Sequence, residues 1–99
     1  MGDWVRSKGE LLDFVSLVLL YAPDEFPRED FLQPHEQLNL RAAFDELRQG
    51  LEAFLRADCD PRVFMRLQSL IEDSYSHYEQ GRILDGGRAL QAFRALAFE

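Results

Sequence analysis

Apolar residues recur every three or four positions over most of this chain, which is the spacing of one face of an α-helix. The longest such run lies between Pro34 and Ala57, and its apolar stripe is Leu40, Phe44, Leu47, Leu51, Phe54 and Leu55. A helix of that length spans roughly 36 Å, the full diameter of a small domain. Because an isolated amphipathic helix is only marginally stable in water, this one requires partner helices.

Signals at the ends of the periodic segments predict four helices, near residues 8–21, 34–57, 61–80 and 86–97. Each start has a capping residue or a proline in the first turn, namely Ser7 with Glu10, Pro34, Asp60 with Pro61, and Asp85. Pro23 ends the first helix and Gly81 the third. No segment alternates with period two, so a sheet is not expected. The sequence predicts one compact all-α, four-helix domain over residues 1–99.

The second and third predicted helices should form an antiparallel hairpin. Their shared core is expected to contain Phe44, Leu47, Leu51, Phe54, Leu67 and Leu70. The first helix differs, because between Leu11 and Leu20 only Asp13 and Ser16 are polar. A helix that is apolar nearly all round is either central to its bundle or presents a spare face to a partner. The sequence leaves both alternatives open.

Composition restricts the class of partner. The 99 residues carry 18 acids and 11 bases, a net charge of −7, which disfavours binding to nucleic acid or to an anionic membrane. The acids are unevenly placed, with eight acids against three bases in residues 1–36 and ten against eight in residues 37–99. The surplus therefore lies around the connection at residues 22–37. An acidic surface suits either solubility or a basic protein partner.

A cytoplasmic location is expected from what the sequence lacks. The N-terminal ten residues do not form a signal peptide. The apolar run that starts at Leu11 is about twelve residues long and is too short to span a bilayer. Cys59 is the single cysteine, so an intramolecular disulfide is impossible and a reducing compartment fits.

Catalytic and metal-binding patterns are absent from the sequence. The two histidines, His35 and His77, belong to no His-Glu-x-x-His or Cys-x-x-Cys pattern, and neither follows a glutamate by three residues as di-iron bundles require. His77 lies one helical turn after Asp73, which predicts a surface pair rather than a proton relay. We therefore expect no metal, no cofactor and no enzymatic activity.

A family resemblance covers residues 45–90. It is carried by DELRQGLEAFLRA, a short Asp-Pro turn, RVFMRLQSLIEDSYSHYEQ and then ILDGGRAL, including the Arg66-Leu67 pair and the closing Arg88-Ala89-Leu90. In these segments the chain resembles the small, acidic, helical immunity proteins that bacteria pair with type VI-secreted toxins, above all the inhibitor of an NAD(P)-hydrolysing toxin. The resemblance implies a toxin inhibitor of bacterial competition: a cytoplasmic protein that covers the active site of a nucleotide- or NAD-consuming toxin.

The predicted contact surface joins the acidic connection to one side of the third helix. Its residues are Asp24, Glu25, Phe26, Glu29, Asp30, Glu72, Asp73, Tyr75 and Glu79. The carboxylates would steer a basic partner and the aromatic rings would anchor it. The alternative is a non-catalytic helical adaptor or a homodimeric interaction module, in which the apolar excess of the first helix serves self-association.

Overall fold

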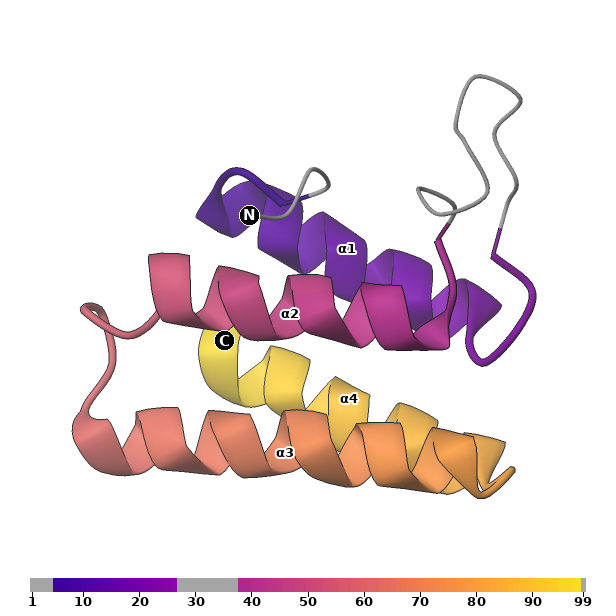
Figure 1. Ribbon diagram of the computed structural model, residues 1–99. Helices are drawn as coiled ribbons and strands as arrows, with labels where there is room; N and C mark the ends of the chain where they lie inside the picture. Colours follow the sequence, from indigo (N-terminus) through magenta and orange to yellow (C-terminus); the bar gives the residue numbers. More distant parts are fainter. Residues whose placement is uncertain (1–4, 27–37, 99) are drawn as a thin grey trace.

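The computed structural model describes residues 5–26 and 38–98. It contains four helices, and they are α1 (Lys8–Tyr21), α2 (Leu40–Phe54), α3 (Pro61–Glu79) and α4 (Ile83–Phe98). The described residues include no strand. The predicted all-α four-helix domain is therefore confirmed (Figure 1).

Each helix runs antiparallel to the one before it (Figure 1). α2 packs on both α1 and α3, and α4 packs on both α3 and α1, so the four helices form a closed ring. The contact between α3 and α4 is the most extensive of the four. As a result, every helix has one face toward the core and two flanks toward neighbours.

The core draws large side chains from all four helices. The fully buried ones include Leu11, Val15, Phe44, Leu47, Leu67, Ile71, Leu90 and Phe93. Five of the six predicted core residues are buried, the exception being Phe54, which is only half-buried. Phe54 is the last residue of α2, and the next residue, Leu55, is fully buried in the core.

Three of the predicted helix-end signals act as expected. The hydroxyl of Ser7 accepts a hydrogen bond from the Glu10 amide at 3.1 Å, and the Asp60 carboxylate accepts one from the Arg62 amide at 2.8 Å. Gly81 follows α3 with φ +79°, the left-handed conformation in which glycine has no steric penalty. These ends depend on neighbours within four residues, which explains why the sequence alone predicts them.

Two predicted helix starts are wrong. α2 begins at Leu40 instead of Pro34, because Asn39 is extended and its side-chain oxygen accepts a hydrogen bond from the Ala42 amide at 2.8 Å. Asparagine is as good an N-cap as aspartate. α4 begins at Ile83, so Asp85 lies in its first turn, where a carboxylate favours the positive end of the helix dipole.

Gly86 explains the close approach of α3 and α4. A Cβ atom at this position would lie 2.8 Å from the Cδ2 atom of the Tyr78 ring, closer than real contacts allow. Because glycine has no side chain, the helices come close enough for the fully buried Ser74 to donate a hydrogen bond to the Gly86 carbonyl at 2.7 Å. At this position a tight van der Waals contact and a buried hydrogen bond hold the two helices close together.

Candidate protein-binding surface

The seven described members of the predicted contact surface lie in two separate groups. Asp24 and Glu25 are exposed just after α1. The other described acids lie on α3, which does not contact α1 within the described residues because the two are opposite members of the ring. Glu29 and Asp30 lie outside the described residues. The surface therefore has to be considered in parts.

Phe26 is not an exposed anchor. It is 8% exposed and belongs to the hydrophobic core. Its burial attaches the chain after α1 to the bundle, which holds the neighbouring Asp24 and Glu25 at a fixed place. The prediction that a partner contacts the Phe26 ring is thus corrected: the ring positions the acids instead.

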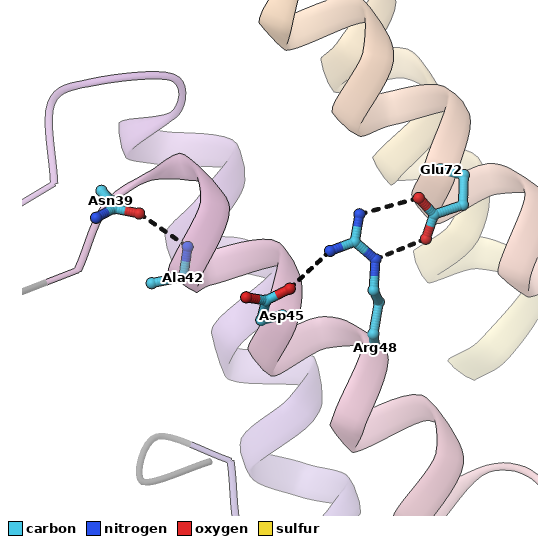
Figure 2. A network of polar contacts seen from close by, with 5 residues as sticks. All are labelled: Asn39, Ala42, Asp45, Arg48 and Glu72. Carbon is cyan, nitrogen blue, oxygen red and sulfur yellow. Dashed lines mark hydrogen bonds and ion pairs between the residues drawn. The ribbon is translucent and has the colours of Figure 1, made fainter. Parts of the chain in front are cut away.

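Glu72 is engaged in an ion pair across α2 and α3. Arg48 of α2 donates from Nε to one carboxylate oxygen of Glu72 at 2.7 Å and from Nη2 to the other at 2.9 Å. Its Nη1 atom donates to Asp45 at 2.8 Å (Figure 2). The hydrogen bonds from Arg48 hold the pKa of Glu72 below its ordinary value. Such a two-point contact fixes the relative position of the helices as well as the charge.

Tyr75 lies beneath the same arginine. The guanidinium carbon of Arg48 is 5.0 Å from the centre of the Tyr75 ring. The centres of the Tyr75 and Phe44 rings are 5.2 Å apart. Desolvation, and secondarily the carboxylate of Glu79, raises the pKa of the Tyr75 hydroxyl. Tyr75 is half-buried between α2 and α3, so its ring contributes to the closure of this bundle rather than to a free contact surface.

Asp73 and Glu79 are the predicted α3 acids that remain exposed without an ion pair to a described residue. On a helix, Asp73 lies about 100° around from Glu72. The predicted surface pair with His77 is not formed, because the Nδ1 atom of His77 is buried and has no hydrogen-bond partner among the described residues. Four predicted acids are therefore exposed without an ion-pair partner there, namely Asp24, Glu25, Asp73 and Glu79.

Sequence reasoning missed the groove between α2 and α3. Its volume is about 280 Å³, and it is lined by Arg48, Leu51, Glu52, Gln68, Ile71 and Glu72. Beside it, Arg56 pairs with Glu52 at 2.7 Å and covers the Phe64 ring at 4.6 Å. An arginine that follows an acid by three or four residues, as Arg48 and Arg56 do, was the available signal for intrahelical pairs. The sequence gives no signal for the partner on α3, which depends on how the helices align.

Exposed apolar side chains gather where α1 ends and α4 begins. Leu20 is 71% exposed, Ile83 51% and Leu84 77%. The two helices meet here, because a Cβ atom at Gly87 would lie 3.9 Å from Leu19 Cδ2. α1 is thus one of the four helices of the ring, and Leu20 is its exposed large apolar side chain at this end.

The described residues hold no group of three or more His, Cys, Asp or Glu side chains that could bind a metal ion. None of the four helices combines the length and apolar composition that a membrane span requires. No protein-family model matches the chain, and comparisons with curated proteins and with solved structures give no match either.

Proposed function

We propose that this protein is an inhibitor that binds another protein, specifically a cytoplasmic immunity protein that occludes the active site of a secreted bacterial toxin. The observation that supports it best is the net charge of −7 together with exposed, unpaired acids on a rigid helical frame. Among the predicted contacts, Asp24, Glu25, Asp73 and Glu79 meet that description within the described residues. The resemblance of residues 45–90 to immunity proteins gives the proposal its specific form.

The physical basis is charge complementarity with a basic cleft. A toxin that consumes nucleotides or NAD needs cationic groups to hold phosphates, and those groups attract an acidic inhibitor. Exposed charges of opposite sign accelerate diffusional encounter and fix orientation, while they add less to equilibrium affinity. An inhibitor of this kind requires shape and charge and needs no catalytic group, no metal and no cofactor.

The proposed contact surface is narrower than the sequence alone suggested. Its centre is Asp24 and Glu25, held by the buried Phe26, with Glu29 and Asp30 retained as proposed contacts outside the described residues. Asp73 and Glu79 are proposed as secondary contacts on α3. Glu72 and Tyr75 support the surface, since Arg48 already occupies the Glu72 carboxylate and covers the Tyr75 ring.

The test is co-expression with a toxin domain encoded beside this chain, with survival and binding kinetics as readouts. Lysine at both Asp24 and Glu25 should slow association about tenfold at low salt and flatten its salt dependence. The matched control places lysine at Glu52 and Asp58, which changes the net charge equally at the distant α2–α3 end. The proposal is wrong if no such toxin exists, or if both double variants associate equally fast.

A second candidate is the adaptor or homodimeric module. The exposure of Leu20, Ile83 and Leu84 favours it specifically. The two functions use different surfaces, so a toxin inhibitor can also self-associate.

A further inference from the structure

The outer side of the α1–α4 seam is a strip of mostly uncharged side chains, with the exposed Arg88 of α4 at its edge. At 100° per residue, Leu12, Ser16 and Leu20 lie along the flank of α1 that borders this seam. On α4 the corresponding flank holds Leu84 and, one and two turns further from the contact with Leu19, the uncharged Gln91 and Ala95. All of these except the half-buried Leu12 are exposed. The strip thus runs along both helices and is most apolar at the Leu20–Leu84 end.

Charges of opposite sign border the strip on its two helices. α1 carries the acids Glu10 and Asp13, and its one base, Lys8, pairs with Asp58 after α2 at 3.4 Å. Residues 82–98, which contain α4, hold three arginines against Asp85; they are Arg82, Arg88 and Arg94. None of these arginines forms an ion pair with a described residue. The face is therefore acidic on one helix, basic on the other and apolar between them.

We propose that this face binds a second copy of the chain, with a two-fold axis parallel to the helices. That operation places α1 of one protomer over α4 of the other, so the acids of each copy meet the arginines of its partner. A two-fold axis across the helices would instead stack α1 on α1 and oppose acid to acid. Charge complementarity thus selects both the occupant and its orientation.

The positions of the apolar residues along the helix axes, called their heights below, also fit this two-fold rotation. Leu19 approaches Gly87, Leu20 is one residue beyond Leu19, and Leu84 is three residues before Gly87. Because the helices are antiparallel, Leu20 and Leu84 lie at heights that differ by only about 3 Å. Rotation about an axis parallel to the helices preserves height, so each Leu20 faces a Leu84 of the other copy. Two such leucine pairs form at the proposed interface.

The first experiment measures self-association of the full chain by sedimentation over a wide concentration range. The wild type should show a reversible monomer–dimer equilibrium, and Leu84→Ser should raise its Kd at least about tenfold, since each dimer loses two buried leucine contacts. Met65→Ser is the matched control: Met65 is 67% exposed on α3, away from the strip, and its removal should leave the Kd unchanged. A wild type that stays monomeric throughout overturns the proposal, and so does equal weakening by both variants.

A cross-linking experiment tests the orientation. In a Cys59→Ser background, Leu20→Cys protein mixed with Leu84→Cys protein should give a disulfide-linked heterodimer under mild oxidation, in preference to either homodimer. Predominance of the homodimer linked through position 20 would mean that α1 packs on α1, which contradicts the proposed axis. This outcome concerns self-association only, so the proposed toxin contact through Asp24 and Glu25 is tested separately by the kinetics above.

Discussion

The ring of four helices has two seams that are closed in opposite ways. At the α2–α3 seam, Arg48 binds Glu72 through two hydrogen bonds and covers Tyr75, which packs on Phe44. At the α1–α4 seam, the outer edge carries the exposed Leu20 and Leu84, and no ion pair among the described residues joins the two helices.

This difference distinguishes a seam that is covered by the molecule's own side chains from a seam that leaves surface for a partner. An edge covered by a paired arginine and a half-buried tyrosine has its polar groups satisfied and little apolar area exposed. An edge of exposed leucines leaves apolar area in contact with water. Contiguous exposed apolar area marks an interaction site. Acidic and aromatic residues at a helix edge, such as Glu72 and Tyr75, therefore do not by themselves indicate a binding surface. The partner of each side chain has to be known.

The largest expected effect is loss of the aromatic centre of the closed seam. Phe44 is fully buried, so Phe44→Ala should cost about 3–5 kcal/mol of unfolding free energy. Against a total of about 5–10 kcal/mol for a domain of this size, that loss nearly unfolds the protein. Urea denaturation followed by circular dichroism measures it. Phe54→Ala is the comparison, and it should cost clearly less because Phe54 is only half-buried; equal costs would contradict this description of the core.

The next effect concerns the α3–α4 contact, where two adjacent glycines provide their own control. Gly86→Ala places a methyl group 2.8 Å from the Tyr78 ring, and the forced displacement should cost about 1–3 kcal/mol. Gly87→Ala meets only ordinary contacts, the nearest at 3.6 Å, and should be neutral or stabilising by up to about 1 kcal/mol because alanine favours helix. Thermal melting of both variants decides; a Gly86→Ala protein as stable as the wild type would contradict the tight packing.

These residues also show how far the sequence leads. Ser7, Asp60 and Gly81 were predictable because each helix end depends on hydrogen bonds to residues close in the chain. Pro34 was predicted as the start of the second helix because proline favours the first turn, but Asn39 forms the N-cap. The pair between Arg48 and Glu72 joins positions 24 residues apart, and its formation depends on the alignment of α2 against α3. Side-chain periodicity fixes which face is buried but not that alignment.

A smaller, pH-dependent effect is expected from the ion pair of the closed seam. The hydrogen bonds from Arg48 lower the pKa of Glu72 in the folded state from an ordinary 4.5. Its stabilisation is therefore complete above pH 4.5 and is lost as the pH falls through the lowered folded-state pKa. Glu72 is exposed on one side, so Glu72→Gln should cost only about 0.5–1 kcal/mol at neutral pH, and nothing well below the folded-state pKa.

Urea denaturation at neutral and acidic pH measures that dependence. Glu52→Gln is the comparison, because Glu52 of α2 pairs with Arg56, which lies two residues after the same helix, and this ion pair does not join two helices. The hydrogen bond from Arg56 also lowers the pKa of Glu52, so Glu52→Gln should change the pH dependence in the same direction, but less than Glu72→Gln because this pair does not join two helices. A Glu72→Gln protein whose stability changes with pH as the wild type's does would show that the pair contributes nothing to closure.

The smallest effect on the stability of the monomer is expected at the α1–α4 seam. A second effect at the same seam should depend on protein concentration. Leu84 is 77% exposed, so Leu84→Ser should change the stability of the monomer by no more than about 0.5 kcal/mol. In dilute solution the variant and the wild type should therefore melt together. If the wild type forms the proposed dimer, its melting temperature rises with concentration, because association stabilises only the folded state. The Leu84→Ser protein should lack that rise, whereas Met65→Ser should keep it. A wild-type melting temperature that is independent of concentration would mean that the α1–α4 face is not closed by a second copy.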